Sequence, residues 1–483
     1  MRSSHIKNSV IRDNIENDRI IELADGIRDV IDAPEFQRLR SIRQMGLSSY
    51  VFPTAEHSRF SHSLGVYATS QLAFGHLRSR AEEMGFQAGY KFDVAAERAF
   101  TVAALCHDIG HTAFSHVLES VLLPEGLLNH EECTLMLLSG NTEIREKIRN
   151  IADVDIDAVE LLIKGTHPNK ALADLISGAL DVDRSDYLLR DSKNSGVGYG
   201  RFDLNWLLHA IDINKNDDGM PIMLLEGARG IDSLRQYLTA RKHMHRQVYF
   251  HPTVRAAQNH LRGIFERIRN LVRDGLTIEL PKCFLFLAKG RRPTIDEFLL
   301  ITDVEVIFLT RFLAQESNDK VLKYLCHKFT RREFPKCVFD TARLPGDSKD
   351  FFRISLGGAE VVDVDLIPNL LPTDDKGKSI EQVTEALRDF VESELEGPEI
   401  PSGAGRYLVS SDPAPFSSSP PIDLKFRFGN DLISLENLVD KGLFGVDVHG
   451  MFESFTIHRM FVPDVVSQSC KDWLLENYGN RGS

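Results

Sequence analysis

Four residues of the kinds that bind transition metals lie in three widely separated stretches of this chain. His62 lies in the run HSRFSHSLGVY, His107 and Asp108 are adjacent in ALCHDIGH, and Asp183 lies in LDVDRSDYLLRD. Each stretch reads as an apolar helical segment, and this order of ligands rarely arises by accident. Two imidazoles and two carboxylates suit a divalent cation such as manganese, iron, zinc or nickel. The pattern therefore predicts helices that meet at one metal site.

Each of these residues taken singly also has an ordinary structural explanation. His62 alone would be a histidine satisfied within a helix, and His107-Asp108 alone would be a helix C-terminus followed by a turn. Found together, the four residues favour a metal, whose bound water has a lowered pKa and can attack phosphorus as hydroxide. Arg59, three residues before His62 on the same helical face, suits a phosphate oxygen because its guanidinium bonds in a bidentate way. We therefore expect a metal-dependent phosphohydrolase.

The composition argues against several other classes of protein. Of 483 residues 42% are hydrophobic and the net charge is −13, which is typical of a globular chain and unlike a broadly basic nucleic-acid surface. No apolar run is long enough to span a bilayer, and MRSSHIKNSVIRDN lacks the apolar core of a secretory signal, so we expect a cytoplasmic protein. The six cysteines have no CxxC spacing and read as reduced core residues: Cys106, Cys133, Cys283, Cys326, Cys337 and Cys470.

Apolar periodicity predicts a mainly α protein with a smaller α+β region at its C-terminus. Asp32 and Glu35 have the spacing of a capping box and predict the start of a helix. Residues 231–272 read as one long helix, or as two helices broken at Pro252.

The character of the sequence changes after Arg343. We expect residues 1–343 to form the catalytic domain, with a core at about 36–200, and residues 344–483 to form the α+β region. Residues 397–421 are rich in Pro, Gly and Ser, which predicts a flexible loop. The C-terminal region carries no readable chemistry: it is interpreted as a partner surface or oligomer support, with structural packing as the plain alternative.

Two further stretches carry polar and aromatic side chains at four-residue spacing. Asp183, Tyr187 and Asp191 share one helical face, and the leucines around them favour a face that lines a site over a solvated face. The second stripe, Arg241, His245 and Tyr249, could be an exposed basic helix face. It could equally hold a nucleotide, because an aromatic ring can stack on a base while an arginine reaches a phosphate. The sequence does not decide between an exposed basic face and a nucleotide-binding face.

More histidines follow the His107-Asp108 pair. They are His111, His116 and His130. His116 and Glu119 have i, i+3 spacing, and a histidine held by a carboxylate is the usual form of a tuned proton donor. Such pairs are also common on protein surfaces, so the interpretation depends on their closeness to the metal ligands.

The sequence resembles a known family, the HD-domain deoxynucleoside triphosphate (dNTP) triphosphohydrolases. It is most similar to the branch with the vertebrate SAM-and-HD-domain dNTPase and its bacterial dGTPase-like relatives. The segments that carry the resemblance are IDAPEFQRLRSIRQMGLSSYVFPTAEHSRFSHSLGVY, ALCHDIGHTAFSH, NHEE, LDVDRSDYLLRDS and TARKHMHRQVYFH. The resemblance is good over residues 9–343 and poor afterwards.

The resemblance implies an HD-domain helical core and hydrolysis of a dNTP to the deoxynucleoside and inorganic triphosphate. It implies one transition metal (Mn, Fe, Zn or Ni) held by His62, His107, Asp108 and Asp183, with Mg²⁺ on the nucleotide phosphates. His116 would protonate the leaving 5′-oxygen, supported by Glu119 and His130, and His111 would lie against the α-phosphate. The implied substrate contacts are Arg59, Arg184 and Arg241 for the phosphates, Gln44 and Asp191 for the 3′-hydroxyl, Tyr187 for the 2′ face, and His245 and Tyr249 for the base.

The vertebrate enzyme and some bacterial relatives form tetramers that nucleotides activate at subunit interfaces, so the resemblance also implies a homo-oligomer, a dimer or a tetramer. The residues that match the regulatory contacts are Asp32, Gln37, Arg40, Arg229, Arg332 and Lys336. Other positions depart from the pattern: Gly227, Gln247 and Pro252 stand where the relative is basic. Oligomerisation is therefore the firmer expectation, and activation by a particular nucleotide the weaker one.

Three functions remain in view, and the first is a dNTP triphosphohydrolase that controls the nucleotide pool or acts in phage defence. The second is an HD-type phosphodiesterase or nuclease on single-stranded nucleic acid. It should have a long basic groove with aromatics, whereas this chain has only local basic clusters such as 328–336. The third is a nucleotide-sensing module without turnover. The complete ligand set together with the sugar-side residues Gln44, Tyr187 and Asp191 favours the first, an enzyme that takes a dNTP.

Overall fold

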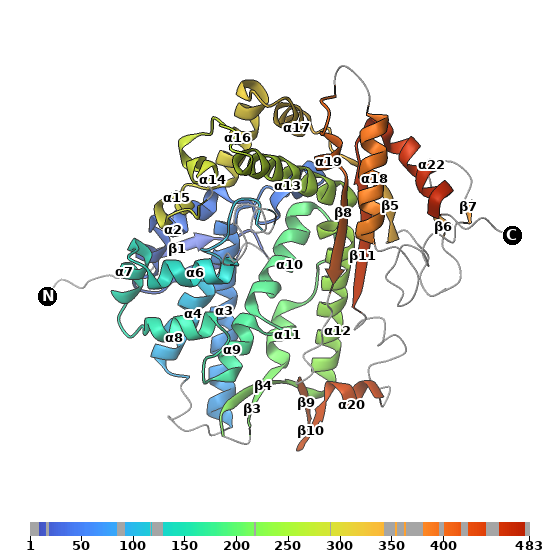
Figure 1. Ribbon diagram of the computed structural model, residues 1–483. Helices are drawn as coiled ribbons and strands as arrows, with labels where there is room; N and C mark the ends of the chain where they lie inside the picture. Colours follow the sequence, from blue (N-terminus) through green and yellow to red (C-terminus); the bar gives the residue numbers. More distant parts are fainter. Residues whose placement is uncertain are drawn as a thin grey trace.

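The chain folds mainly into α-helices, as its periodicity predicts (Figure 1). The computed structural model describes residues 9–15, 19–84, 92–115, 117, 129–216, 219–289, 291–341, 353–354, 362–363, 380–395, 400–416, 424–440 and 454–478. None of the helices described there is long and apolar enough to cross a membrane.

Three helices form the part of the core that positions the site. They are α3 (Arg59–Glu83), α4 (Val94–Cys106) and α10 (Val182–Ser195), and α3 packs against both of the others. A capping side chain accepts a backbone hydrogen bond in the first turn and satisfies a donor that the helix cannot. The three capping residues are Ser58, Asp93 and Asp181.

The other helices cover this core and build a second layer. The shorter helices up to residue 210 are α1 (Ile27–Ile31), α2 (Pro34–Gln37), α6 (His130–Ser139), α7 (Glu143–Arg149), α8 (Ile156–Ile163), α9 (Lys170–Ser177) and α11 (Leu204–Ala210). They are followed by α12 (Gly227–Met244), α13 (Pro252–Arg273), α14 (Leu285–Ala288), α15 (Ile295–Leu299), α16 (Asp303–Glu316) and α17 (Lys320–Thr330). A π-helical turn (His245–Tyr249) separates α12 from α13, which begins at Pro252, so the second of the two alternatives, two helices broken there, is the one observed.

Strands from the middle of the chain pair with strands from its C-terminal part. In one sheet, β5 (Lys336–Asp340) and β8 (Ser410–Phe416) flank β11 (Phe455–Val462), and both pairings are antiparallel. In a second, the order is β10 (Asp431–Ser434), β9 (Lys425–Phe428), β4 (Pro221–Glu226) and β3 (Ile211–Lys215). Two small ladders are β1 (Ser9–Arg12) with β2 (Ile20–Leu23), and β6 (Arg353–Ile354) with β7 (Val362–Asp363).

The C-terminal region is thus α+β, with most of its helices beside the first sheet and α20 beside β10 of the second (Figure 1). These helices are α18 (Ile380–Glu394), α19 (Gly405–Leu408), α20 (Leu435–Asp440) and α22 (Ser467–Tyr478). Strand pairing crosses residue 343 in both larger sheets, because β5 and β4 precede it and β11 and β9 follow it. The domain division at residue 343 stays a prediction.

The prediction of a loop over residues 397–421 is wrong for its central part. That part contains α19 and then β8, which pairs with β11 over seven residue positions. The proline-rich composition suggested a loop, but Pro413 and Pro415 lie at alternate positions of an edge strand. A proline is tolerated there because its missing N–H can face away from the ladder. Asp412, Ala414 and Phe416 alternate with them and are buried.

The expected capping box at Asp32 and Glu35 is also wrong. Asp32 instead ends α1, and Ala33 precedes α2 without a side-chain cap. Glu35 is 3% exposed and accepts hydrogen bonds from the backbone N–H of Glu143 at 2.9 Å and of Ile144 at 3.3 Å. Its carboxylate therefore caps the neighbouring helix α7, a tertiary contact that local spacing does not reveal.

Candidate metal centre and adjoining pocket

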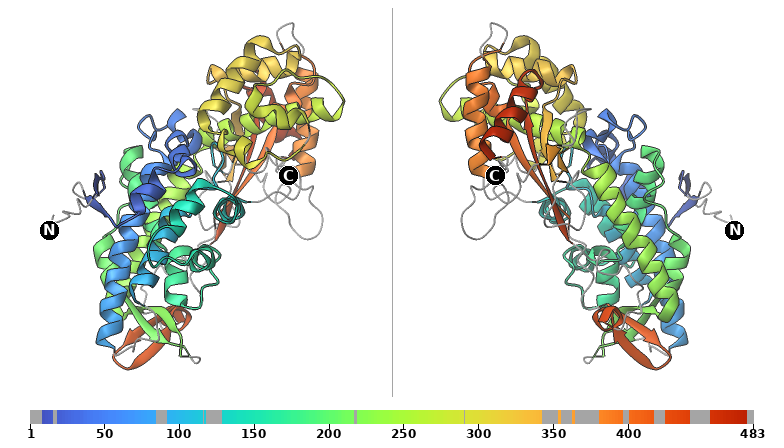
Figure 2. Two further views of the ribbon diagram at one scale, coloured as in Figure 1. Left: turned by 90° about the vertical axis from the view of Figure 1, so that its left-hand side faces the viewer. Right: turned by 90° about the vertical axis from the view of Figure 1, so that its right-hand side faces the viewer.

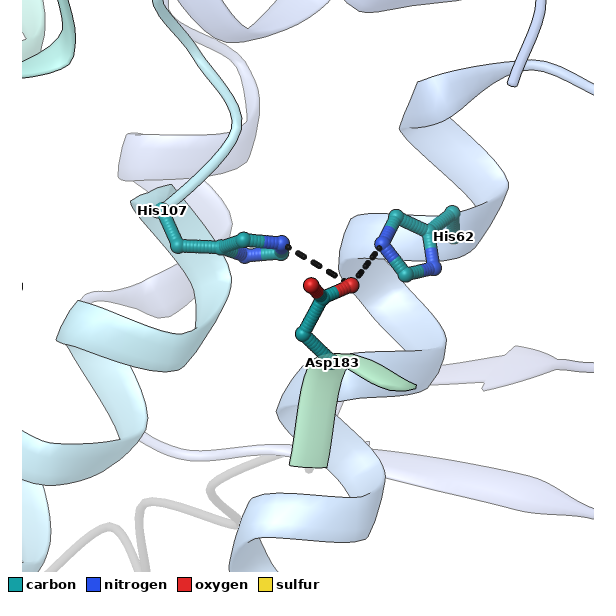
Figure 3. Close-up of side chains that lie close together, drawn as sticks. All are labelled: His62, His107 and Asp183. Carbon is teal, nitrogen blue, oxygen red and sulfur yellow. Dashed lines mark ion pairs between the residues drawn. The ribbon is translucent and has the colours of Figure 1, made fainter. Parts of the chain in front are cut away.

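Three of the predicted ligands meet at one point inside the helical core (Figure 3). His62 lies in the first turn of α3, His107 directly follows α4, and Asp183 lies in the first turn of α10. The Oδ1 atom of Asp183 is 3.0 Å from Nε2 of His62 and 3.5 Å from Nε2 of His107. One ligand atom from each residue lies within 4.8 Å of the others, which is a spacing that one cation can bridge.

Asp108 also lies close to this point. Its Oδ1 is 3.2 Å from Nε2 of His107, and its Oδ2 is 3.6 Å from Nε2 of His62. Arg59 donates a hydrogen bond to this carboxylate and two more to the hydroxyl of Ser115. In this arrangement Arg59 holds Asp108 beside the centre and also borders the adjoining pocket.

The outer nitrogens of both histidines are already bonded. Nδ1 of His62 is 2.9 Å from Oδ2 of Asp186, and Nδ1 of His107 is 2.8 Å from the carbonyl oxygen of Ala104. A proton on each Nδ1 leaves the Nε2 lone pairs directed at the centre, which is the tautomer that a metal ligand requires. Both Nε2 atoms are buried without a hydrogen-bond partner among the described residues. The donor set and these two atoms fit a divalent cation.

The electrostatics of the centre point the same way. Burial by itself would lower the pKa of His62, but the carboxylates of Asp183 and Asp186, one beside each ring nitrogen, raise it to about 10. Burial would raise the pKa of Asp183, whereas the two imidazoles lower it well below its usual range. The carboxylates therefore keep their negative charge and favour a positive charge between them, either protons on the imidazoles or a cation that displaces these protons.

Two of the predicted catalytic histidines lie next to the ligands. Nε2 of His111 is 3.3 Å from Oδ1 of Asp108. The rings of His111 and His130 stack at 4.0 Å between centroids, with 10° between their planes. His116 and Glu119 lie outside the described residues.

A cavity of about 310 Å³ adjoins the centre at Arg59. Six of the predicted substrate residues line it: Gln44, Arg59, Tyr187, Asp191, His245 and Tyr249. Burial lowers the pKa of His245 to about 4, so its ring is neutral near pH 7. Tyr187 and Tyr249 meet edge to face at 6.1 Å.

The other two predicted phosphate contacts do not line this cavity. Arg184 is paired with Asp181 at 2.9 Å, and Arg241 lies 5.2 Å from the centre of the Phe416 ring. Arg184 belongs to α10, which borders the cavity, and Arg241 to α12, which ends just before the π-helical turn that borders it. In this arrangement both arginines contact the protein.

The structure also brings in residues that sequence reasoning missed. Nε2 of His57 is 2.8 Å from Oδ1 of Asp191, and the hydroxyl of Tyr249 donates to Oδ2 at 2.8 Å. His57 opens the run HSRFSH, five residues before a ligand, and this closeness was a usable signal. Phe416 of β8 packs 4.9 Å from the ring of His245, and no signal could have found it in a stretch that reads as a loop.

Two more arginines border the cavity. Arg255, Gln258 and Arg262 lie on one face of α13 and border the cavity. Arg255 donates from Nε to Asp412 of β8 at 2.7 Å, so the C-terminal region holds part of this wall in place.

The predicted regulatory residues fall in three places. Asp32, Gln37 and Arg40 lie close together near α2, where Arg40 donates to Oε1 of Gln37 at 2.7 Å. Arg332 and Lys336 line a larger hollow of about 680 Å³, and Arg229 lines another of about 530 Å³. Neither hollow includes a predicted metal ligand. Within one chain these six residues do not form a single site.

Comparison with known proteins places this site in a family. Residues 59–191, which include all four predicted ligands, match the family model described as HD domain. The chain is 34% identical over 309 residues to the uncharacterized protein YwfO of Bacillus subtilis, covering 64% of this chain and 66% of that protein. It is 32% identical over 336 residues to the putative HD domain-containing protein L394 of Acanthamoeba polyphaga mimivirus, covering 62% and 72%.

A human relative is named for its activity. The chain is 30% identical over 260 residues to human SAMHD1, a deoxynucleoside triphosphate triphosphohydrolase, covering 48% of this chain and 40% of that protein. The alignments thus span between 40% and 72% of the length of these three relatives. A crystal structure of a phosphohydrolase from Bacteroides thetaiotaomicron matches with a TM-score of 0.71 and 25% identity, covering 94% of this chain and 100% of that one. The chain therefore belongs to the HD-domain family, whose members bind divalent metals.

Proposed function

We propose that this chain is a metal-dependent dNTP triphosphohydrolase, which converts a dNTP and water to the deoxynucleoside and inorganic triphosphate. The observation that carries the proposal is the HD ligand set directly beside a cavity lined by Tyr187, Asp191 and Tyr249. The activity named for the human relative supports it. The family and the site already support the more general assignment as a metal-dependent phosphohydrolase.

Residues around the metal centre would have separate roles in this reaction. A bound cation supplies a Lewis acid and lowers the pKa of an attacking water. Arg59 borders both the centre and the cavity, where its positive charge can offset charge that develops on a phosphate. His111, next to Asp108, would lie against the α-phosphate, and His130, which stacks on it, would support the acid that protonates the leaving 5′-oxygen. His116, which we propose as the acid that protonates this oxygen, is assigned from the resemblance.

The far end of the cavity would hold the deoxynucleoside. Asp191 accepts from Tyr249 and lies within bonding distance of His57, so its carboxylate is fixed where a sugar hydroxyl could donate to it. His245 is neutral near pH 7 and therefore suits contact with an uncharged base. We also propose a homo-oligomer with nucleotide activation, and manganese as a suitable metal, with a role in control of the nucleotide pool.

The test is a product analysis. Manganese-loaded protein is incubated with each dNTP, with all four together and with ribonucleotides, and the products are separated by anion exchange. We expect deoxynucleoside and intact triphosphate in equal amounts. Absence of triphosphate under every condition would refute the proposal, and cleavage of single-stranded oligonucleotide that His107→Ala abolishes would favour a nuclease.

The aromatic side chain of Tyr187 should set the preference for deoxyribose. Tyr187→Ala opens space beside the sugar, so the ratio of dNTP to NTP hydrolysis should fall by about tenfold, the scale on which a pocket senses one small group. Metal content should stay at the wild-type value. Tyr199→Ala, which removes a tyrosine that is 45% exposed, is the matched control. Equal losses of metal and activity in Tyr187→Ala would mean that the residue is structural.

His57 should matter for substrate binding through Asp191. His57→Ala removes one partner of a buried carboxylate, which costs about 1.5–3 kcal/mol, or about 10–100-fold in kcat/KM. Tyr249→Phe removes the partner on the other oxygen of the same carboxylate and should give a loss of the same order. Steady-state kinetics at saturating Mn²⁺ measure both. Wild-type kinetics in His57→Ala would contradict the assignment.

A further inference from the structure

Behind His62, on the side away from the metal centre, a row of buried charges leads outward. Nδ1 of His62 contacts Asp186 at 2.9 Å, and Asp186 binds Arg190 through two hydrogen bonds of 2.8 and 3.0 Å. Arg190 in turn donates to both oxygens of Asp13 at 2.9 Å. The side chains of His62, Asp186, Arg190 and Asp13 are 0%, 1%, 1% and 6% exposed. The row therefore runs continuously through the protein from a metal ligand to the N-terminal segment.

The N-terminal segment holds Asp13 in position. Asp13 follows β1, which pairs with β2 in a small ladder at the periphery of the helical core (Figure 2). Arg19, just before β2, donates to Asp13 at 3.0 Å and to the carbonyl oxygen of Gly65 at 3.2 Å. The segment is thus attached to α3 one turn after His62, at the helix that carries the ligand.

Helix α3 leaves room for these charges at Gly65. A Cβ atom at this position would lie 2.0 Å from Nη2 of Arg190 and 2.1 Å from Oδ1 of Asp186. Any other residue would therefore displace the pair. Buried ions stabilise a fold only when their geometry is good and their partners are complete, and here two arginines face two aspartates. In such a row the position of each side chain depends on that of its neighbour, because moving one of them leaves the other with an unpaired buried charge.

We propose that Asp13 is a positioning residue of the metal centre. Through Arg190 and Asp186 it fixes the orientation and the tautomer of His62, so the N-terminal segment sets the metal affinity of a site whose ligands all lie elsewhere in the chain. The inference rests on the metal centre of the proposed function and not on the substrate. Its test is therefore metal binding, which is informative whichever nucleotide the protein cleaves.

The first experiment compares two carboxylate-to-amide changes in the same N-terminal segment, one just after β1 and one in β2. Asp13→Asn should raise the dissociation constant for Mn²⁺ about tenfold, the lower end of what partners beyond the ligands contribute. The signal of free Mn²⁺ in electron paramagnetic resonance measures it, with the thermal midpoint of the metal-free protein recorded alongside. Glu22→Gln, on the exposed face of β2, is the matched control and should bind like wild type. Equal Mn²⁺ affinity in the two variants would overturn the proposal.

A double-mutant cycle separates positioning from general destabilisation. Asp186→Asn interrupts the row next to His62, so in that background Asp13→Asn should weaken Mn²⁺ binding by less than about twofold. A full tenfold effect in both backgrounds would show that Asp13 acts by another route and would overturn the proposal. If Asp13→Asn does not fold, Asp13→Glu keeps the charge but displaces Arg190. It should still bind Mn²⁺ more weakly than Glu22→Gln, and equal binding would again refute the idea.

Discussion

Replacing His107 with alanine should remove the bound metal and lower phosphohydrolase activity by about 1,000-fold or more. The imidazole supplies one of the three ligand atoms that lie within 4.8 Å of each other. A bound cation contributes several kcal/mol of charge stabilisation in such reactions, and 1.36 kcal/mol corresponds to a tenfold change in rate. Metal content by mass spectrometry and the rate of product release measure the two effects on the same preparation.

The fold should survive this change, which makes the result interpretable. The His107 side chain makes a hydrogen bond to Ala104 of its own helix end, and its backbone carbonyl, which alanine retains, accepts from Thr134. His209→Ala is the matched control, because His209 is exposed and lines the separate hollow of about 530 Å³. It should keep metal and activity. A His107→Ala protein with wild-type metal content would contradict the assignment of the centre.

Arg190→Met should lower the free energy of unfolding by about 3–5 kcal/mol, the usual cost of removing one partner from a buried ion pair. The guanidinium lies between Asp13 and Asp186, and without it both carboxylates stay buried with less compensation. Urea unfolding of the metal-free protein measures the change. Lys147→Met, at an exposed pair with Glu143 on α7, should change the value by less than about 0.5 kcal/mol. A loss below about 1 kcal/mol in Arg190→Met would contradict this prediction.

The effect of Arg190→Met should depend on pH. Burial alone would raise the pKa of Asp186, but Arg190 and His62 hold it well below its usual range. A carboxyl whose pKa is lowered by folding stabilises the protein above the pKa of the unfolded state, about 3.9, and this contribution is lost as the pH falls. The difference between wild type and Arg190→Met should therefore shrink below about pH 4. A difference that is constant from pH 7 to pH 3 would assign the loss to packing.

Much of the site could be predicted because its signals are local. His62, His107 and Asp183 each lie beside a helix end, and the capping residues Ser58 and Asp181 directly precede two of those helices. The resemblance to HD-domain enzymes then related these segments to one another. The stripe of Asp183, Tyr187 and Asp191 follows from helical spacing alone, and two of its members line the cavity.

Other features could not be predicted because their partners are distant in the chain. Glu35 caps a helix 108 residues later, where local spacing suggested a capping box at its own helix. The His57–Asp191 contact joins residues 134 positions apart, and the Arg190–Asp13 contact joins residues 177 positions apart. A charged side chain in a sequence gives no indication of whether it is solvated or buried against an opposite charge.

The sequence by itself determined most of the helices and indicated the residues of the candidate metal centre, because these signals depend on interactions between residues within one or two turns. Only the tertiary structure decided that β8 is an edge strand whose Phe416 and Asp412 support the cavity wall, because the strand exists through its pairing with β11. It also decided that the N-terminal segment supports His62. A local sequence pattern is compatible with many different contact partners. Which of these contacts form depends on long-range pairing and burial, and these arise only when the whole chain packs.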